Sequence, residues 1–255
     1  MGALFSCHKN AITGRRGLSL LPESEMIGMS LTEYDKFLSA NPPLPTTDSR
    51  VVMVKNIGSR IQRAVEKYYA EKGLSSQLAG YKWEFNVVNE SSVNAWCMPG
   101  GKVVVYTGIL PVTQDEASLA IVMGHEIAHA VAKHGNERMS QGMVAQFGGA
   151  ALSVATQQKP ALTQALFQQS YGIVSQLGIL KYSRTHETEA DKMGLIFAAM
   201  GGYNPEVAVG FWERMAKLSN GKKPMELLST HPSDETRINN LKSFMPEAKK
   251  YYRPQ

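Results

Sequence analysis

Two histidines four residues apart are the feature of this sequence best suited to chemistry. The segment reads His125-Glu126-Ile127-Ala128-His129 and lies inside an apolar run. On a helix with ~3.6 residues per turn, His125 and His129 share one face, so both can bind the same Zn²⁺. Glu126 follows the first histidine directly, where a carboxylate can act as a general base. The pattern predicts a zinc hydrolase with one Zn²⁺ per chain.

The flanking residues predict a helix that carries this motif. Thr113 and Glu116 have the spacing of a capping box at the start of a helix. Gly135 stands where a C-terminal glycine cap would end it. On one continuous helix, His134 lies about 140° from the face of His129. We therefore expect His134 to interact with the helix dipole rather than with the metal.

A catalytic zinc usually has three protein ligands and one open position, so the sequence should contain a third ligand. Gly135 occupies the position where a metzincin has its third histidine, which excludes that class. Better candidates lie in residues 183–191, Ser-Arg-Thr-His-Glu-Thr-Glu-Ala-Asp, where Glu187 and Asp191 share one helical face. Glu189 lies about 200° around the helix from Glu187, which favours a structural or solvated role.

The two motifs together resemble the gluzincin metallopeptidases that include CAAX prenyl proteases, heat-shock membrane zinc peptidases and periplasmic lipoprotein peptidases. The resemblance covers most of the chain from about Arg50 onward and is closest to the soluble bacterial lipoprotein branch. It implies that Glu187 is the third zinc ligand. It also implies that Asp191 accepts a hydrogen bond from a ligand histidine, which fixes the tautomer of that histidine.

A strand, a tight turn and a second strand are expected over residues 94–106, after another strand within residues 81–87. Residues 94–101 are similar to the N-A-x-x-x-P-G-G segment of the family. This resemblance implies that Asn94, Ala95 and Trp96 belong to a sheet edge beside the zinc. An unpaired edge can bind an extended peptide through main-chain hydrogen bonds. The alternative is an ordinary hairpin near the core.

Residues 230–238 resemble the C-terminal H-P-x-x-x-x-R element of the same family. The resemblance implies that His231 and Arg237 approach the metal, where either can stabilise an oxyanion. His231 can instead occupy the open zinc position and hold the enzyme latent. A further alternative is a loop histidine that leads into a helix, and the residues alone leave the choice open.

The expected elements describe an α+β protein that is mostly α, with a small, largely antiparallel sheet, and the resemblance implies a compact zincin-like domain. The 255 residues suffice for one or two domains. The prolines of residues 42–45 separate an N-terminal arm, residues 1–45, from a zinc metallopeptidase domain, residues 46–255. The arm is expected to contain a helix from Glu23 to Ala40 that packs on the domain. The formal net charge is +5, without a basic run interleaved with aromatic residues, which argues against nucleic acid as a partner.

Two segments bear on location. Leu4-Phe5-Ser6-Cys7 matches a bacterial lipobox, which predicts lipidation of Cys7 and a membrane-anchored protein on the periplasmic side of the envelope, with the outer membrane favoured. A disulfide to Cys97 is the alternative. Residues 139–180 contain several glutamines that interrupt any apolar span of about 20 residues, so a helical hairpin over the active site is favoured over a membrane helix.

These observations predict a zinc-dependent endopeptidase. The resemblance extends this to cell-envelope protein quality control, with unfolded or misassembled proteins as substrates. The alternative is a chaperone-like or latent zinc-binding scaffold. Glu126 argues against a scaffold, because a structural zinc site has no use for a general base and normally has four protein ligands. The sequence does not fix the oligomeric state.

Overall fold

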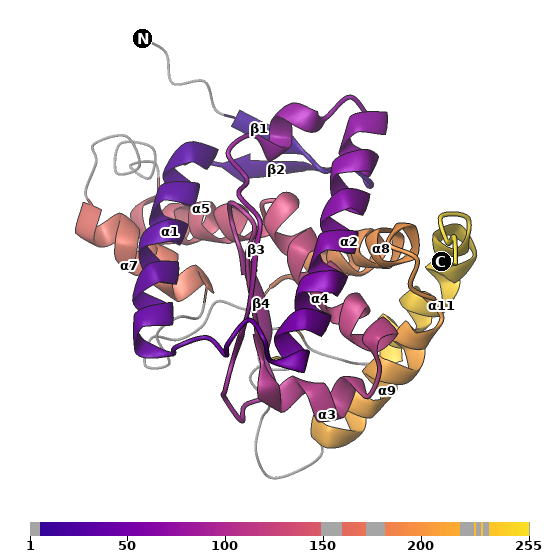
Figure 1. Ribbon diagram of the computed structural model, residues 1–255. Helices are drawn as coiled ribbons and strands as arrows, with labels where there is room; N and C mark the ends of the chain where they lie inside the picture. Colours follow the sequence, from indigo (N-terminus) through magenta and orange to yellow (C-terminus); the bar gives the residue numbers. More distant parts are fainter. Residues whose placement is uncertain are drawn as a thin grey trace.

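A computed structural model describes residues 6–148, 160–171, 182–219, 227, 231 and 235–254 (Figure 1). The helices are α1 (Glu23–Ala40), α2 (Ser49–Glu71), α3 (Leu110–Thr113), α4 (Glu116–Val131), α5 (His134–Phe147), α7 (Pro160–Tyr171), α8 (Arg184–Met200), α9 (Val207–Ser219) and α11 (Glu235–Lys249). The strands are β1 (Ser6–Lys9), β2 (Arg16–Ser19), β3 (Glu84–Val88), β4 (Ala95–Met98) and β5 (Lys102–Tyr106). Short 3-10 turns cover Ser75–Leu78 and Thr107–Ile109. The predicted α+β class with mostly helical content is confirmed.

The central sheet has the strand order β3-β5-β4. Strand β5 pairs parallel with β3 and antiparallel with β4, so the sheet is mixed. The tight turn between β4 and β5 contains Gly100 and Gly101, whose φ angles of 88° and 83° favour glycine. Strands β1 and β2 form a separate antiparallel hairpin at the N-terminus. Strand β4 therefore lies at one edge of the central sheet.

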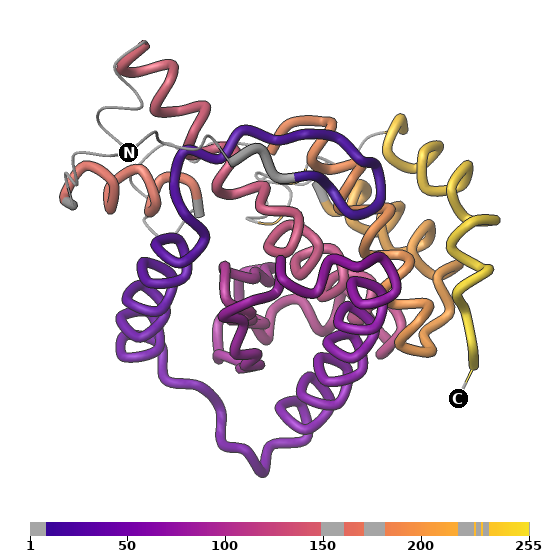
Figure 2. Tube along the Cα trace, turned by 90° about the horizontal axis from the view of Figure 1, so that it is seen from above, coloured from indigo at the N-terminus to yellow at the C-terminus, as the bar shows by residue number. Residues whose placement is uncertain are grey.

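Helices cover both faces of the central sheet. Val103 and Val105 belong to the main hydrophobic core, together with the apolar faces of α2 and α4. Val104 and Tyr106 point to the other face and pack with Tyr34 of α1. Figure 2 shows α1 and α2 on opposite sides of the strands. This alternation follows from the two-residue period of a strand, and β5 is buried along its whole length.

Helices α4 and α8 cross in backbone contact. A Cβ atom at Gly194 would lie 2.8 Å from the backbone nitrogen of His125, and one at Gly124 would lie 2.9 Å from the carbonyl oxygen of Gly194. Only glycine permits this approach. The crossing brings the histidines of α4 next to the first turns of α8, where Glu187 and Asp191 lie.

The ends of α4 differ from the sequence prediction. The side chain of Asp115, not Thr113, caps the helix by accepting a hydrogen bond from the backbone N–H of Ser118 at 2.6 Å. Thr113 instead ends α3. At the other end, α4 stops at Val131 and Lys133 adopts a left-handed φ of 60°. The chain thus turns before His134, and the predicted glycine cap at residue 135 is wrong because that residue lies within α5.

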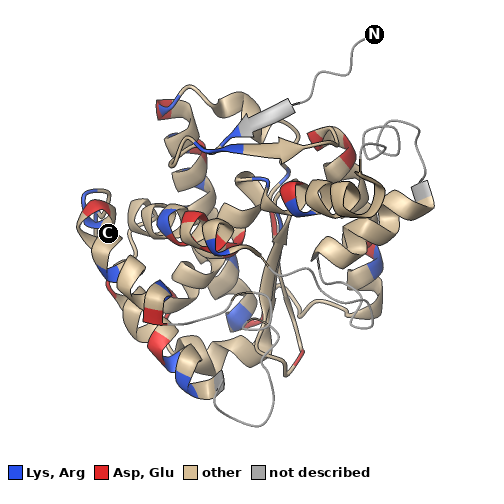
Figure 3. Ribbon diagram, turned by 180° about the vertical axis from the view of Figure 1, so that it is seen from behind, with Lys and Arg blue, Asp and Glu red and all other residues tan. Residues whose placement is uncertain are grey.

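The predicted helical hairpin of residues 139–180 corresponds in part to α5 and α7, which pack together. Met139 and Met143 of α5 share a small core with Leu166 and Phe167 of α7 and Met26 of α1. Residues 149–159 and 172–181 of the predicted cover over the active site lie outside the described part of the chain. Within the described residues, no helix combines the length and the apolar character that a bilayer crossing needs. Acidic and basic residues both occur on the outer helices (Figure 3).

Candidate active site

Four side chains from three separate segments meet below the α4–α8 crossing. His125 and His129 come from α4, Glu187 comes from the first turn of α8, and His231 precedes α11. One ligand atom from each lies within 4.8 Å of the other three, and all four residues are buried. Each of these residues was singled out from the sequence, and the structure brings them together.

The imidazole of His125 is oriented by a carboxylate. Its Nδ1 lies 3.0 Å from Oδ1 of Asp191, so Nδ1–H donates and Nε2 keeps its lone pair for a metal. Arg237 holds both oxygens of Asp191, at 2.7 and 2.9 Å, and its guanidinium lies 3.4 Å from the ring centroid of Trp212. Burial opposes the charge on Asp191, but Arg237 outweighs it and lowers the pKa of Asp191.

His129 is oriented by a second histidine. Its Nδ1 lies 3.0 Å from Nδ1 of His134, whose Nε2 lies 3.0 Å from Oε2 of Glu189. A carboxylate only accepts, so Nε2–H of His134 donates to Glu189 and its Nδ1 accepts from His129. This leaves Nε2 of His129 free to bind a metal. Burial lowers the pKa of His134 to about 4, which keeps the ring neutral at neutral pH.

His134 is the site residue that the sequence prediction missed. The prediction placed it on a continuation of α4, whereas the turn at Lys133 carries it back beside His129. Glu189 is not part of the ligand cluster, and it is buried rather than solvated. The signal in the sequence that could have indicated His134 is a third histidine close to the motif, together with a second glutamate in the E-x-E-A-D segment.

Burial and nearby charges shift the pKa values of the two carboxylates of the centre in opposite directions. Burial favours the protonated form of Glu187, but His231 and Arg237 outweigh it and lower the pKa of Glu187 well below its usual range. In Glu126, burial prevails over the nearby histidines and raises the pKa. Glu187 is therefore suited to bind a cation, and Glu126 is suited to take up a proton.

The spacing of the donor atoms fits zinc. A tetrahedral site with Zn–N bonds of about 2.0–2.1 Å separates two ligand nitrogens by about 3.3 Å. The Nε2 atoms of His125 and His129 are 3.1 Å apart, and each lies 3.5 Å from an oxygen of Glu187. Because both histidines use their Nδ1–H elsewhere, neither can donate to the other. A cation between these lone pairs makes the arrangement favourable.

His231 supplies a fourth donor to the same cluster. Its Nδ1 lies 3.3 Å from Nε2 of His125 and 2.9 Å from Oε1 of Glu187. Its Nε2 lies 3.6 Å from Oε1 of Glu126, a buried atom with no hydrogen-bond partner among the described groups. Tyr182 stacks on His231 with ring centroids 5.1 Å apart. His231 therefore stands at the corner of the cluster that a catalytic zinc would leave open.

The sequence matches the model of peptidase family M48 over residues 58–245. The chain belongs to peptidase family M48. The matched region contains all four residues of the histidine and glutamate centre. The third ligand position, Glu187, lies in the matched region, as do the candidate residues His231 and Arg237.

Curated relatives of this M48 chain come from mitochondria and bacteria. The Mitochondrial metalloendopeptidase OMA1 of Saccharomyces cerevisiae is 34% identical over 219 residues, which cover 82% of this chain and 60% of the relative. The human Metalloendopeptidase OMA1, mitochondrial, is 32% identical over 247 residues, 94% of this chain and 46% of the relative. The Beta-barrel assembly-enhancing protease of Escherichia coli is 28% identical over 166 residues, 61% of this chain and 33% of the relative. The M48 chain thus spans 60% or less of these three proteins.

The predicted substrate strand of the M48 domain lies at the sheet edge and packs against α4. Ala95 and Trp96 belong to β4, and Asn94 directly precedes it. On the outer side of this edge, the backbone N–H of Leu227 donates to the carbonyl of Val93 at 3.3 Å. The opposite edge, β3, is covered by the chain at Pro43 through an isolated bridge. Strand β4 therefore forms the edge of the sheet that lies beside the motif helix.

The predicted lipidation site lies at the N-terminal limit of the described chain. Cys7 belongs to strand β1, and its side chain lies outside what the structure describes. Cys97 is a buried free thiol, so the disulfide between Cys7 and Cys97 is not formed.

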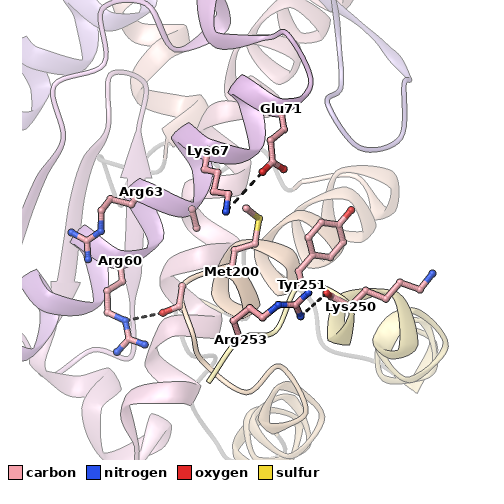
Figure 4. Close-up of a pocket in the computed structure, with 10 residues that line it drawn as sticks. Arg60, Arg63, Lys67, Glu71, Met200, Lys250, Tyr251 and Arg253 are labelled. Carbon is pink, nitrogen blue, oxygen red and sulfur yellow. Dashed lines mark hydrogen bonds and ion pairs between the residues drawn. The ribbon is translucent and has the colours of Figure 1, made fainter. Parts of the chain in front are cut away.

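A second recess, with a volume of about 300 Å³, lies away from the M48 centre (Figure 4). It is lined by Arg60, Arg63, Ala64, Lys67, Glu71, Met200, Gly201, Lys250, Tyr251 and Arg253. Figure 4 shows Arg63 and Lys250 pointing in different directions, and Arg253 donates to the main-chain oxygen of Lys250 at 3.0 Å. Its cations do not converge on one point, so the buried centre is the stronger candidate site.

Proposed function

We propose that this M48 metalloendopeptidase uses Zn²⁺ to cleave unfolded or misassembled proteins in quality control of a bacterial cell envelope. The main supporting observation is the buried His125–His129–Glu187 cluster with a carboxylate oxygen of Glu126 beside it that has no hydrogen-bond partner among the described residues. A structural zinc site has no use for such a base. The name of the Escherichia coli relative, Beta-barrel assembly-enhancing protease, supports a role in the envelope.

Each residue of the centre would have its own role in peptide hydrolysis. His125, His129 and Glu187 would hold the metal, and Asp191 and His134 fix the tautomers of the two histidines. Zn²⁺, when bound, supplies a Lewis acid that polarises the scissile carbonyl and makes water a nucleophile at neutral pH.

Glu126 moves the proton in this mechanism. Its carboxylate accepts a proton from the attacking water and delivers that proton to the leaving amine. Burial raises the pKa of Glu126, which makes its carboxylate a stronger base than one in water. Neighbouring Ile127 and Ala128 are fully buried and exclude bulk water from this helix.

The position of β4 at the edge of the sheet supports an extended, unfolded substrate. A peptide added to this edge through Asn94, Ala95 and Trp96 forms main-chain hydrogen bonds, which place few demands on its sequence. A folded protein has its own backbone groups already paired and cannot present such a strand.

The position of His231 favours a second candidate function, a latent peptidase. With His231 as a fourth protein ligand, the metal site is closed, as in structural zinc sites. Leu227 connects this histidine to the substrate edge, because its N–H bonds Val93 while its carbonyl accepts from the N–H of His231 at 2.8 Å. A peptide that adds to β4 competes for Val93 and so draws His231 from the metal.

The contacts of Arg237 indicate that it holds the carboxylates of the centre in place rather than stabilising the oxyanion. Its guanidinium binds Asp191 and lies 3.2 Å from Oε2 of Glu187. With its donors directed at these two carboxylates, we assign Arg237 a positioning role and no part in oxyanion stabilisation.

Lipidation of Cys7 would tether the domain to the periplasmic side of a membrane, with the outer membrane favoured. Metabolic labelling with a fatty-acid probe, followed by membrane fractionation, tests this proposal on the wild type and on Cys7→Ala. Label and membrane association in the wild type alone support it. A soluble, unlabelled wild type contradicts it.

The substrate proposal is tested with one globular protein supplied in two forms, folded and reduced with alkylated cysteines. We expect zinc-dependent cleavage of the unfolded form and none of the folded form. Equal cleavage of both forms would contradict the proposal. Zinc binding without cleavage of either form would favour the chaperone-like or latent scaffold.

A further inference from the structure

A loop of the N-terminal hairpin reaches the metal centre in a preformed shape. The side chain of Asn10 accepts hydrogen bonds from the backbone N–H groups of Ile12 and Thr13, each at 2.9 Å. The backbone N–H of Asn10 donates to the carbonyl of Arg15 at 2.8 Å, and Gly14 has a φ of 69°. Turns of this kind fix the backbone before it meets other elements. The loop therefore presents Arg15 in a defined direction.

Arg15 clamps two buried glutamates on different helices. Its Nε and Nη2 donate to the two oxygens of Glu189 on α8, both at 2.9 Å. Its Nη1 and Nη2 donate to the two oxygens of Glu137 on α5, both at 2.8 Å. The hydroxyl of Thr13 also donates to Glu189. Bidentate arginine–carboxylate pairs fix orientation as well as charge, and here one guanidinium fixes two carboxylates.

The same glutamates hold the histidines that back the ligand His129. Glu189 accepts from His134, which accepts from His129. Glu137 lies 3.3 Å from Nε2 of His186, whose ring stacks on His134 with centroids 4.5 Å apart. The ring of His134 is thus held at both its edge and its face by groups that Arg15 orders.

The two ligand histidines have parallel supports. His125 is backed by Asp191, which Arg237 of α11 holds in a bidentate pair. His129 is backed by His134 and Glu189, which Arg15 holds. One arginine comes from the C-terminal end of the described chain, and the other comes from the hairpin that precedes the domain predicted from the sequence.

We propose that Arg15 is a positioning residue for the metal ligand His129 and acts through Glu189 and His134. The hairpin loop then helps to hold the residues of the metal centre in position. The inference rests on the metallopeptidase activity but not on any particular substrate. Loss of Arg15 leaves Glu137 and Glu189 side by side without their shared cation, so the carboxylate that aims His134 loses its fixed orientation.

The test compares Arg15→Met with Arg16→Met in the full chain. Arg16 lies next to Arg15, is exposed, and has the same charge, which makes its variant a matched control. Zinc dissociation constants are measured by competition with a chelator. We expect Arg15→Met to weaken zinc binding by about 10–100-fold, the usual effect of losing such support, and Arg16→Met to change it less than about twofold. With saturating zinc, Arg15→Met should lower kcat more than it raises KM.

A double-mutant cycle separates positioning from general stabilisation. His134→Phe keeps a ring against His186 but removes both hydrogen bonds. If Arg15 acts through His134, the double variant should lose little more zinc affinity than His134→Phe alone. Equal zinc affinity in Arg15→Met and Arg16→Met would overturn the proposal. Losses that simply add in the double variant would overturn it as well. Absence of zinc binding in the wild type would instead contradict the metal assignment itself.

Discussion

At the scale of single residues, the centre depends on which nitrogen of each imidazole carries the proton. Asp191 accepts from Nδ1 of His125, and His134 accepts from Nδ1 of His129, so both Nε2 lone pairs face the same point. Glu187 adds a carboxylate whose pKa His231 and Arg237 hold low against the effect of burial. The chemistry follows from these partners as much as from the ligands.

His231 provides a prediction at this scale. If His231 fills the fourth metal position, His231→Ala should raise the rate of peptide cleavage while one zinc remains bound, because three ligands suffice for a catalytic site. Cleavage of a short unstructured peptide and zinc content are measured together. A fall in kcat with unchanged zinc content would contradict capping and favour oxyanion stabilisation by His231. Ser233→Ala in the same segment is the control.

The residues of the centre could be predicted from the sequence only where a motif fixes their spacing. His125, Glu126 and His129 are placed by one helical turn, and Glu187 by resemblance over a distance of about sixty residues. His134 could not be placed, because its position depends on the left-handed conformation of Lys133, which residue type alone does not indicate.

At the scale of elements, the crossing of α4 and α8 sets the geometry of the centre. Gly124 and Gly194 let the two backbones touch, which brings the ligands of α4 within reach of Glu187. The sequence shows two glycines in apolar helical runs but does not show that they face each other. Contacts of this kind depend on the whole fold.

Gly194→Ala should move these two helices apart. Its Cβ would lie 2.8 Å from the backbone nitrogen of His125, and backbone cannot move aside as a flexible side chain does. We expect a loss of about 1–3 kcal/mol in the free energy of unfolding, as for other overpacked sites, together with weaker zinc binding. Denaturant unfolding and chelator competition measure the two effects.

The matched control is Gly28→Ala in α1, where a Cβ would meet nothing within 4 Å. This variant should gain up to about 1 kcal/mol, since alanine favours a helix more than glycine does. Equal effects of the two substitutions would contradict the role assigned to the crossing.

Elements were predicted best where the pattern is local. The helix from Glu23 to Ala40 and the turn at Gly100 are found where expected. The parallel pairing of β3 with β5 was not foreseen, because it joins strands that are not adjacent in the sequence and depends on the chain between them. The N-terminal hairpin was missed, since its strands are short and follow no clear alternation.

At the scale of the whole molecule, segments far apart in the sequence meet at the centre. Arg15 from the N-terminal hairpin and Arg237 from α11 each hold a carboxylate of α8. The metal therefore lies where several distant segments converge, and its binding should stabilise the entire domain rather than one loop.

Metal removal should consequently lower the melting temperature. Zinc at a thousandfold excess over its Kd stabilises the folded state by about 4 kcal/mol, which corresponds to a shift of about 10 °C for a domain of this size. Calorimetry before and after chelation, with zinc content measured on the same samples, checks this shift. Added Zn²⁺ should restore it, while Mg²⁺ should not. A zinc-free protein with an unchanged melting temperature would contradict a metal shared by these segments.

The most direct test of the central claim compares zinc content and casein cleavage in the wild type and Glu126→Gln. This substitution leaves the ligands His125, His129 and Glu187 in place and removes only the base. The account predicts one zinc per chain in both proteins, with cleavage reduced at least about 10²–10⁴-fold in the variant. Undiminished cleavage by Glu126→Gln, or a wild type without zinc, would contradict it.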